Sequence, residues 1–341
     1  MRSIASIRSA VSGVVPGAAL LVTLVLSQAA GAAAQTLTFT PAGTIPGPVD
    51  QVDIHGNLLF MVSEKTLTIY DVTNPAAPKK GGSYSFPEKI WGVRAVGPLL
   101  YVAADFFGLA ILDISNPSTP VLRGSIKTPG QAKNVALVGT KALVADHMSG
   151  VDHIDVSDPA KPVNLGSFFL DGYARDVASS GQRAYAVDSP AGVYVFDFSR
   201  PGPFEPVGSV QSANATRTIE LADIGSGKLL ALMPGAGGHL QIYDVSTPAS
   251  PVKVTAFKMP GPVLRVAVRN THAYVADGRE GMHVVDLSNA AQPSIVGAHK
   301  TAAPARDVAV KDGFVFVVAG ALPQGNVHAG GGEVVILRQT P

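Results

Sequence analysis

Six residues whose side chains bind anions or stack on ligands stand at the starts of short apolar runs spread along the chain. They are one tryptophan, one lysine and four arginines: Trp91, Lys133, Arg175, Arg217, Arg265 and Arg306. Guanidinium groups bind carboxylates and phosphates through paired hydrogen bonds, and aromatic side chains anchor sugars and proteins. If the fold brings these residues together, they predict a binding site for a sugar acid, a phosphate or a carboxylate.

The same residues also have a structural interpretation. Two of the arginines directly precede an aspartate, in Arg175-Asp176 and Arg306-Asp307, and further aspartates recur along the chain at Asp105, Asp146, Asp188 and Asp277. Ion pairs with these acids would neutralise the cations and leave no ligand site. Trp91, together with Phe106 and Phe107, predicts either an aromatic recognition patch or ordinary core packing. The sequence leaves these alternatives open.

Three histidines form a second candidate site. His147, His239 and His328 fall in predicted loops, and His147 directly follows Asp146. Histidine combined with a carboxylate is a suitable ligand set for a divalent metal ion. The three histidines have none of the close spacing that marks many zinc sites, so solvated loop histidines are the alternative interpretation.

Common catalytic motifs are missing from the sequence. It contains no Gly-x-Ser-x-Gly motif, no metalloprotease helix motif and no phosphate-binding loop; Gly225-Ser226-Gly227-Lys228 lacks the helix that such a loop requires. His153 occupies an apolar strand position that other parts of the chain fill with isoleucine or valine. We therefore expect it to be a buried histidine with its hydrogen bonds satisfied.

A repeated phrase must position all these side chains. Its clearest copy spans residues 108–117, and its aspartate recurs at Asp71, Asp113, Asp155, Asp197, Asp244 and Asp286, in steps of 42, 42, 42, 47 and 42 residues. A degenerate seventh copy lies at residues 334–338. A period of this length with several strands per unit is typical of β-propeller blades. We expect each aspartate to fix the turn that follows its strand.

Each unit contains four strand-like runs. In the second unit they are residues 92–96, 99–103, 109–114 and 121–126, with Pro117 and Pro120 between the last two. Seven inner trios of strands can be counted, but only six are followed by a fourth strand. Residues 37–45 supply the missing one. The sequence thus predicts an all-β, seven-bladed propeller with four-stranded antiparallel blades, closed by the N-terminal strand.

The repeated phrase resembles the repeat that gives the LVIVD-repeat family its name. Residues 67–71, 109–113, 193–197 and 282–286 match it, and residues 305–310 and 273–277 resemble its upstream half. The resemblance covers nearly all of the chain after the first 34 residues. It implies a secreted or surface-associated bacterial propeller, and it identifies no catalytic residue.

The first 34 residues differ from the rest. Arg2 and Arg8 precede an apolar run that is densest at residues 18–26, and Ala32-Ala33-Ala34 is a small-residue cleavage site. This pattern predicts a secretory signal peptide at 1–34, followed by a propeller at 35–341. A retained membrane anchor is the alternative, although the apolar core is shorter than a bilayer span.

Charge and cysteine content restrict the partners. The chain has 26 basic and 25 acidic residues, and loss of Arg2 and Arg8 leaves the two kinds nearly balanced. We therefore expect neither nucleic acid nor a membrane surface as a partner, and no stable membrane span after cleavage. The absence of cysteine excludes disulfides, so the core alone must stabilise the secreted protein.

These observations predict a non-catalytic, monomeric scaffold in the periplasm or outside the cell. It would bind a protein or a surface glycan through loops on one face, without a required cofactor. The alternative is a metal-assisted hydrolase or lyase that acts on an anionic small molecule at the channel mouth. It would use the arginines for orientation and the three histidines for metal or acid–base chemistry. A third hypothesis, a structural adhesion module, would require an apolar patch on the outer strands.

Overall fold

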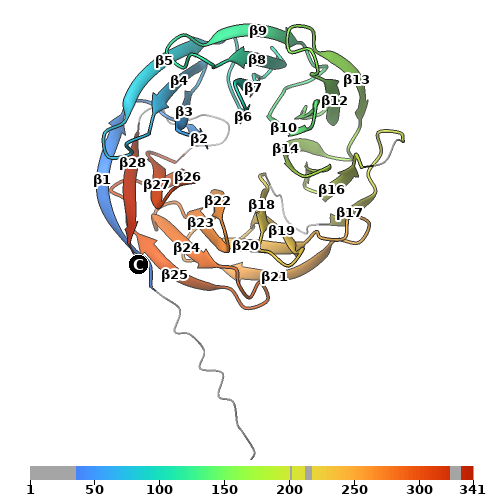
Figure 1. Cartoon of the computed structure of the whole chain (residues 1–341). Helices are drawn as coiled ribbons and strands as arrows, with labels where there is room; N and C mark the ends of the chain where they lie inside the picture. Colours follow the sequence, from blue (N-terminus) through green and yellow to red (C-terminus); the bar gives the residue numbers. More distant parts are fainter. Residues whose placement is uncertain (1–35, 200–201, 212–216, 323–331, 341) are drawn as a thin grey trace, which may run out of the picture. The chain divides into compact units, whose positions relative to one another are not determined.

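The computed structural model describes residues 36–199, 202–211, 217–322 and 332–340. In these residues the chain forms seven four-stranded antiparallel sheets, which surround a central channel as the blades of a propeller (Figure 1). The predicted fold class is confirmed. The predicted signal peptide lies outside the described residues. Within the described part of the chain, no helix has the length and apolar character needed to cross a membrane.

The first four blades are consecutive meanders, with the first strand at the channel and the fourth at the outer edge. Blade 1 contains β2 (Gln51–His55), β3 (Leu58–Ser63), β4 (Thr66–Asp71) and β5 (Lys79–Ser85). Blade 2 contains β6 (Gly92–Val96), β7 (Leu99–Ala103), β8 (Leu109–Asp113) and β9 (Val121–Ile126). Blade 3 contains β10 (Asn134–Val138), β11 (Lys141–Ala145), β12 (Val151–Asp155) and β13 (Val163–Phe168). Blade 4 contains β14 (Tyr173–Ser180), β15 (Arg183–Ser189), β16 (Gly192–Asp197) and β17 (Gly208–Gln211).

The last three blades follow the same order until the chain ends. Blade 5 contains β18 (Glu220–Asp223), β19 (Leu229–Gly235), β20 (His239–Asp244) and β21 (Val252–Lys258). Blade 6 contains β22 (Arg265–Arg269), β23 (His272–Ala276), β24 (Met282–Asp286) and β25 (Ser294–His299). Blade 7 contains β26 (Ala305–Lys311), β27 (Phe314–Ala319) and β28 (Glu333–Thr340), and β1 (Thr38–Pro46) is its outermost strand.

The N-terminal strand closes the ring as predicted. β1 pairs antiparallel with β28 from Thr38 opposite Thr340 to Pro46 opposite Glu333, so residues from both ends of the propeller share one sheet (Figure 1). Ile45 on β1 is buried in the apolar cluster between blades 7 and 1. Closure therefore adds hydrophobic contacts as well as a hydrogen-bonded ladder, and it pairs two strands that would otherwise be open edges.

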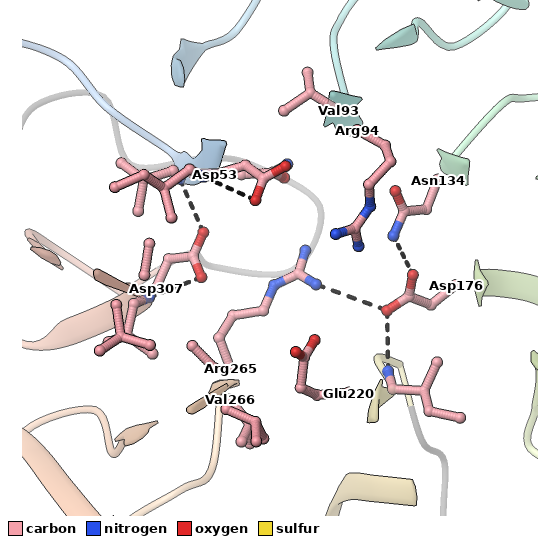
Figure 2. Close-up of a pocket in the computed structure, with 18 residues that line it drawn as sticks. Asp53, Val93, Arg94, Asn134, Asp176, Glu220, Arg265, Val266 and Asp307 are labelled. Atoms are coloured by element: carbon pink, nitrogen blue, oxygen red, sulfur yellow. Dashed lines mark hydrogen bonds and ion pairs between the residues drawn. The ribbon is translucent and has the colours of Figure 1, made fainter. Parts of the chain in front are cut away.

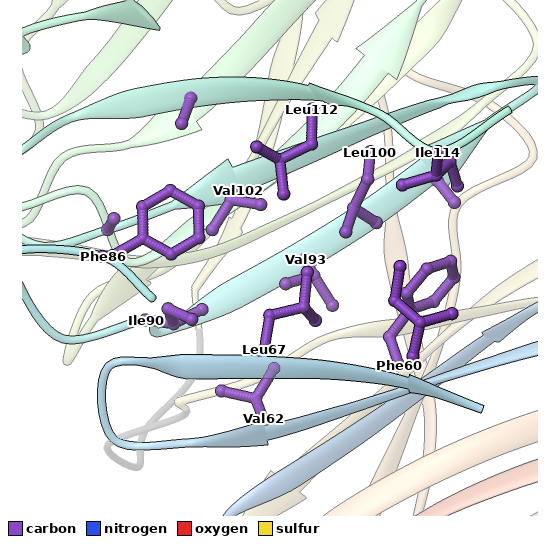
Figure 3. Packing of buried hydrophobic residues seen from close by; sticks show 14 residues of the cluster. Phe60, Val62, Leu67, Phe86, Ile90, Val93, Leu100, Val102, Leu112 and Ile114 are labelled. Atoms are coloured by element: carbon purple, nitrogen blue, oxygen red, sulfur yellow. The ribbon is translucent and has the colours of Figure 1, made fainter. Parts of the chain in front are cut away.

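Each pair of neighbouring blades shares an apolar cluster. Between blades 1 and 2, Phe60, Val62 and Leu67 face Val102 and Leu112 (Figure 3). The second and third strands of a blade contact neighbours on both faces, and for this reason they are almost continuously apolar. The fourth strands alternate between exposed and half-buried residues because they have only one covered face.

The repeated aspartates form the predicted turns. In all six copies an Asp carboxylate oxygen accepts a hydrogen bond from the backbone N–H two residues later, for example from Ser115 to Asp113 at 2.9 Å and from Ser157 to Asp155 at 2.9 Å. This bond ends the third strand and turns the chain toward the fourth. The aspartates are structural, as predicted.

Glycine is required where the third strand begins. Gly108 has a φ of 86°, and a Cβ atom there would lie 2.3 Å from the carbonyl oxygen of Ile126. Gly150 has a φ of 80°, and a Cβ atom there would lie 2.1 Å from the carbonyl oxygen of Phe168. A side chain at either position would displace the fourth strand. The repeat therefore fixes the loops between the second and third strands, which border the channel mouth.

Removal of side-chain volume from the closing strand tests the closure. Ile45→Ala should lower the free energy of unfolding by about 2–5 kcal/mol, because it leaves a cavity between blades 7 and 1. Urea unfolding followed by circular dichroism measures the change. Ile295→Ala, on the outer strand β25 where the side chain is exposed, is the matched control and should change stability by less than about 1 kcal/mol. Equal losses in the two variants would contradict this role of β1.

Candidate functional site

All six predicted ligand-binding residues line one pocket at the mouth of the channel. This pocket, here called the mouth pocket, has a volume of about 270 Å³, and its walls contain Trp91, Lys133, Arg175, Arg217, Arg265 and Arg306. Two carboxylates, Asp50 and Asp307, also line it, so cations outnumber acids by five to two. The inner strands bring the residues together because each one lies at the channel end of a different blade, from blade 2 to blade 7.

Lys133 is held against the wall of the mouth pocket. Its ammonium group lies 4.1 Å from the centre of the Trp91 ring and 4.0 Å from a carboxylate oxygen of Asp105. The Trp91 indole N–H donates a hydrogen bond to the same carboxylate oxygen at 2.9 Å. Burial lowers the pKa of Lys133 from 10.5 to about 8, with Asp105 opposing and the charge of Arg175 adding to the shift. Trp91 is thus a support for Lys133 as well as part of the pocket.

Arg175 and Arg217 are the least compensated cations of the mouth pocket. Among the described residues neither forms an ion pair, and Nε of Arg175 is buried with no hydrogen-bond partner. The Arg175 guanidinium lies 5.4 Å from the centre of the Tyr173 ring. Burial and the neighbouring charge of Arg217 lower the pKa of Arg175. A bound anion would relieve this repulsion.

Arg265 and Arg306 have structural partners. Arg306 donates a hydrogen bond to the carbonyl oxygen of Val49, which links blade 7 to blade 1. Arg265 of blade 6 lies 3.8 Å from the carboxylate of Asp176 in blade 4, on the far side of the channel (Figure 2). For these two arginines the structural interpretation holds in part, although both still line the mouth pocket.

Asp176 and Asp307 tie neighbouring blades together. Asp307 accepts hydrogen bonds from the backbone N–H of Val308, at 2.8 Å, and of Val52 in blade 1, at 3.0 Å. Asp176 accepts equivalent bonds from Val177, at 2.8 Å, and from Ile219 in blade 5, at 3.0 Å. Each carboxylate thus bonds the inner strand of the next blade. The carboxylates of Asp176 and Asp307 therefore accept backbone hydrogen bonds, although each directly follows an arginine of the mouth pocket in the sequence.

The aspartates after the second strands mostly do not pair with the cations of the mouth pocket. Asp146 accepts a hydrogen bond from the backbone N–H of Gly130, and Asp277 accepts one from Gly261 at 2.9 Å. Among the four aspartates of this group, Asp105, Asp146, Asp188 and Asp277, only Asp105 lies within ion-pair distance of one of the six residues in the described part of the chain. The structural alternative, in which such pairs neutralise the site, does not hold for Arg175 and Arg217 among the described residues.

Below the mouth pocket the channel is lined by a cluster of charged side chains. This channel cluster contains Asp53, Arg94, Asp176, Glu220, Arg265 and Asp307, which line a second cavity of about 260 Å³ (Figure 2). Four acids face two arginines, so they cannot all ionise without repulsion. Burial, with added repulsion from Asp176 and Asp53, raises the pKa of Glu220 from 4.5 to about 7, against the opposing charge of Arg94. Burial likewise raises the pKa of Asp307 to about 6.

The channel cluster was not predicted from the sequence. Asp53, Arg94 and Glu220 occupy a repeat position that blades 3, 4, 6 and 7 fill with alanine, at Ala136, Ala178, Ala267 and Ala309. Charged residues at a position that is otherwise alanine were the available signal. The sequence alone does not show that these three side chains share one cavity.

The predicted metal ligands do not form a described site. His147, on blade 3, stacks on Tyr173 with ring centres 4.8 Å apart, and Nδ1 of His239, on blade 5, lies 3.0 Å from the carbonyl oxygen of Ala236. His328 lies outside the described residues. Within the described ranges, no group of three or more His, Cys, Asp or Glu side chains is arranged to hold a metal ion. The metal site, and the hydrolase or lyase that depends on it, stay predictions.

His153 differs from its expected state. Its ring lies 5.3 Å from Phe198 and 4.8 Å from Phe204 between ring centres, but Nε2 is buried and has no hydrogen-bond partner among the described residues. Burial lowers the pKa of His153. The prediction of a satisfied histidine is wrong, because the aromatic wall that covers the ring supplies no acceptor or donor to Nε2.

Sequence comparison identifies the repeat. The family model for the LVIVD repeat matches five segments, residues 46–85, 89–128, 129–169, 171–211 and 260–301. Together they cover more than half of the chain. The chain belongs to the LVIVD-repeat family. The segments correspond to blades 1 to 4 and to blade 6, so the family model passes over the two blades that depart most from the repeat. None of the curated proteins matches the sequence.

Solved structures share the propeller fold of this LVIVD-repeat protein at low sequence identity. The Cps50 (Swd1) β-propeller domain of Myceliophteria thermophila is 13% identical, with a TM-score of 0.69 over 88% of this chain and 99% of that one. Raptor of Chaetomium thermophilum is 13% identical, with a TM-score of 0.71 over 90% of this chain but 29% of Raptor. The computationally designed Ika8 protein is 9% identical, with a TM-score of 0.62 over 89% and 99%. These similarities establish the fold alone.

Replacement of His153 tests the cost of its buried nitrogen. His153→Leu should raise the free energy of unfolding of the LVIVD-repeat protein by about 1–3 kcal/mol, the usual cost of a buried unsatisfied polar group. The gain should grow as the pH falls below about 6.5, because the unfolded chain then takes up a proton that the native state resists. Urea unfolding at pH 8 and pH 5.5 measures both effects. The exposed His55→Leu should show neither, and a loss of stability in His153→Leu would refute the assignment.

Substitution of Glu220 tests the electrostatics of the channel cluster. The native state holds the Glu220 proton more tightly than the unfolded chain does, so native stability falls as the pH rises through the interval from 4.5 to about 7. The free energy of unfolding of Glu220→Gln should therefore equal that of the parent protein near pH 4.5. At pH 8 it should be higher than that of the parent, by on the order of 2 kcal/mol. Urea unfolding across this range measures the difference. Glu64→Gln, at an exposed site, should show no such trend; a flat difference for Glu220→Gln would disprove the pKa shift.

Proposed function

We propose that this propeller is a non-catalytic binding module that recognises an anionic group of its partner in the mouth pocket. The observation that carries the proposal is the pair Arg175 and Arg217, which face the pocket without an ion pair among the described residues. Buried or crowded cations are costly unless an anion accompanies them. A carboxylate or phosphate supplied by a ligand would provide the missing charge through guanidinium hydrogen bonds.

The carboxylates already in the pocket are poor substitutes for that anion. Asp307 uses its oxygens to accept backbone hydrogen bonds from Val52 and Val308, and Asp50 accepts one from the backbone N–H of Glu64 at 2.9 Å. Lys133 is partly balanced by Asp105, but Arg175 and Arg217 lie on the next two blades. The positive charge is therefore concentrated on blades 4 and 5, and we place the centre of the anion site there.

The mouth pocket is small for a drug-sized ligand but large enough for a small anion or for the anionic group of a larger partner. Pockets for drug-sized ligands have volumes of roughly 300–1,000 Å³. A cavity of about 270 Å³ accommodates one charged group with its immediate neighbours. The partner we propose is a protein or a glycan outside the cytoplasm, held by its anionic group while the rest contacts the surrounding loops. The extracytoplasmic location is supported by the predicted signal peptide.

Thermal shift with small anions tests the proposal. Citrate, inorganic phosphate and galacturonate are added to the protein at low ionic strength, where screening is weak. An anion present at a hundred times its dissociation constant should add about 2.7 kcal/mol of stability, which a melting curve detects readily. Arg217→Gln should weaken binding of the stabilising anion at least about tenfold, a loss of about 1.4 kcal/mol.

Arg123→Gln is the matched control for this experiment. Arg123 is also an exposed arginine, but it lies on the outer strand β9 and away from the channel. The Arg123→Gln variant should bind the anion as tightly as the parent protein does. If no anion stabilises the parent protein, or if Arg123→Gln loses as much affinity as Arg217→Gln, the mouth pocket is not an anion site.

A further inference from the structure

Four large apolar side chains are exposed on consecutive loops of blades 2 to 4. They form the apolar arc, which consists of Phe106, Met148, Phe169 and Tyr173, with exposed fractions of 56%, 73%, 72% and 40%. Phe106 and Met148 lie in loops between second and third strands, and Phe169 and Tyr173 flank the connection from β13 to β14. Exposed apolar side chains that lie together on neighbouring loops are a feature of interaction sites, whereas isolated ones are ordinary on a soluble surface.

Backbone contacts join these loops into one continuous rim. The loop that carries Phe106 forms a bridge from Asp105 to Ala132, and the loop that carries Met148 forms one from His147 to Ala174. A Cβ atom on Gly150 would lie 2.8 Å from the Cα of Phe169, so the chain at Phe169 runs against the Met148 loop. His147 also stacks on Tyr173 at 4.8 Å between ring centres. The apolar arc is therefore held in place by backbone pairing.

The apolar arc adjoins the mouth pocket at two points. At one end, Asp105, which precedes Phe106, accepts the hydrogen bond from Trp91 and lies 4.0 Å from Lys133. At the other end, the guanidinium of Arg175 lies 5.4 Å from the Tyr173 ring. Arg175 of the pocket wall thus lies beside Tyr173 of the arc, and Phe106 directly follows the aspartate that contacts Trp91 and Lys133. A ligand anchored in the pocket would extend over the arc.

We propose that the mouth pocket and the apolar arc form one docking surface for an extended segment of a partner protein, in which a carboxylate lies beside apolar side chains. The proposal rests on the anion site proposed above and specifies its ligand. Charge complementarity places the carboxylate over Arg175 and Arg217, and the adjacent apolar side chains then cover Phe169, Met148 and Phe106. Aromatic residues, Met and Arg are the types enriched at protein interfaces.

The chemistry of the arc favours a protein segment over a glycan. Sugar recognition requires hydrogen-bonding groups beside the aromatic faces, but Phe106, Met148 and Phe169 have apolar side chains that offer no conventional donor. Met148 has a flexible thioether that adapts to varied apolar partners. A glycan would leave most of its hydroxyls unpaired against this surface, which costs free energy. Apolar side chains of a peptide would bury the arc without this loss.

A peptide selection tests the docking surface. A phage-displayed library of random dodecapeptides is selected against the full chain, and the recovered peptides are synthesised and their dissociation constants measured by fluorescence polarisation. We expect Asp or Glu within a few positions of Leu, Ile, Phe or Met. The double variant Met148→Ser/Phe169→Ser should weaken binding at least tenfold, as should Arg217→Gln, since exposed anchors at an interface often contribute that much. Replacement of the acidic residue in the peptide by its amide should weaken binding similarly.

A matched double variant separates the arc from apolar exposure in general. Val121→Ser/Val163→Ser removes two side chains of similar exposure, 55% and 54%, at the starts of the outer strands β9 and β13. It should bind the selected peptides as the parent protein does. Melting temperatures of all variants verify that they are folded.

The remaining outcomes distinguish the two proposals. If acidic peptides lose affinity with Arg217→Gln but not with Met148→Ser/Phe169→Ser, the anion site stands and the docking surface is refuted. If oligogalacturonate binds in an arc-dependent manner while no peptide is recovered, the partner is a glycan and the docking surface for protein is refuted. If neither peptide nor small anion binds, the proposed function itself fails.

Discussion

Pairing of β1 with β28 is the interaction on which the rest of the structure depends. It converts seven similar units into a closed ring, so the channel ends of all seven inner strands meet around one axis (Figure 1). The inter-blade bond from Asp307 to Val52 lies at the same junction. In an open array, the cations of blades 3, 4 and 5 would follow one another along an edge. Closure is what makes them face blades 6 and 7 across a pocket.

The same closure stacks opposite charges along the channel. The inner strands place cations at the mouth and acids deeper in the channel: Asp176 and Asp307 come one residue after an arginine, and Glu220 comes three residues after Arg217. Arg265 and Asp307 line both cavities. In a narrow channel the charges are poorly screened, so each layer acts on the other. The acids of the channel cluster attract the cations above them and repel an entering anion. This arrangement favours an anion that stops at the mouth, beside Arg175 and Arg217, over one that moves deeper.

The fold could be predicted from the sequence because repetition is a long-range signal. One aspartate turn is weak evidence, but six at a nearly constant spacing, with strand-like runs between them, indicate blades. The missing fourth strand then predicted closure by residues 37–45, one residue from the observed β1 (Thr38–Pro46). Five of the six predicted residues of the mouth pocket could be predicted for the same reason, because equal repeat positions occupy equal places in the ring. Arg265 lies one position later, after Leu264. Which cations of the pocket are neutralised by an acid could not be predicted, because this depends on side-chain rotamers. Lys133 lies near the carboxylate of Asp105, whereas the guanidinium of Arg175 lies near the ring of Tyr173.

Departures from the repeat separate the residues that build the ring from those that do not. The aspartate turns, the glycines at the third strands and the inter-blade carboxylates recur because a blade needs them. Phe106, Met148 and Phe169 contribute little buried surface to any blade, and their exposure carries the solvation cost of apolar area in water. Glu220 and Arg94 are charged residues at a repeat position that is alanine in four other blades. Because the fold gains nothing evident from the three exposed apolar side chains, we attribute their position beside the mouth pocket to the partner-binding role proposed above.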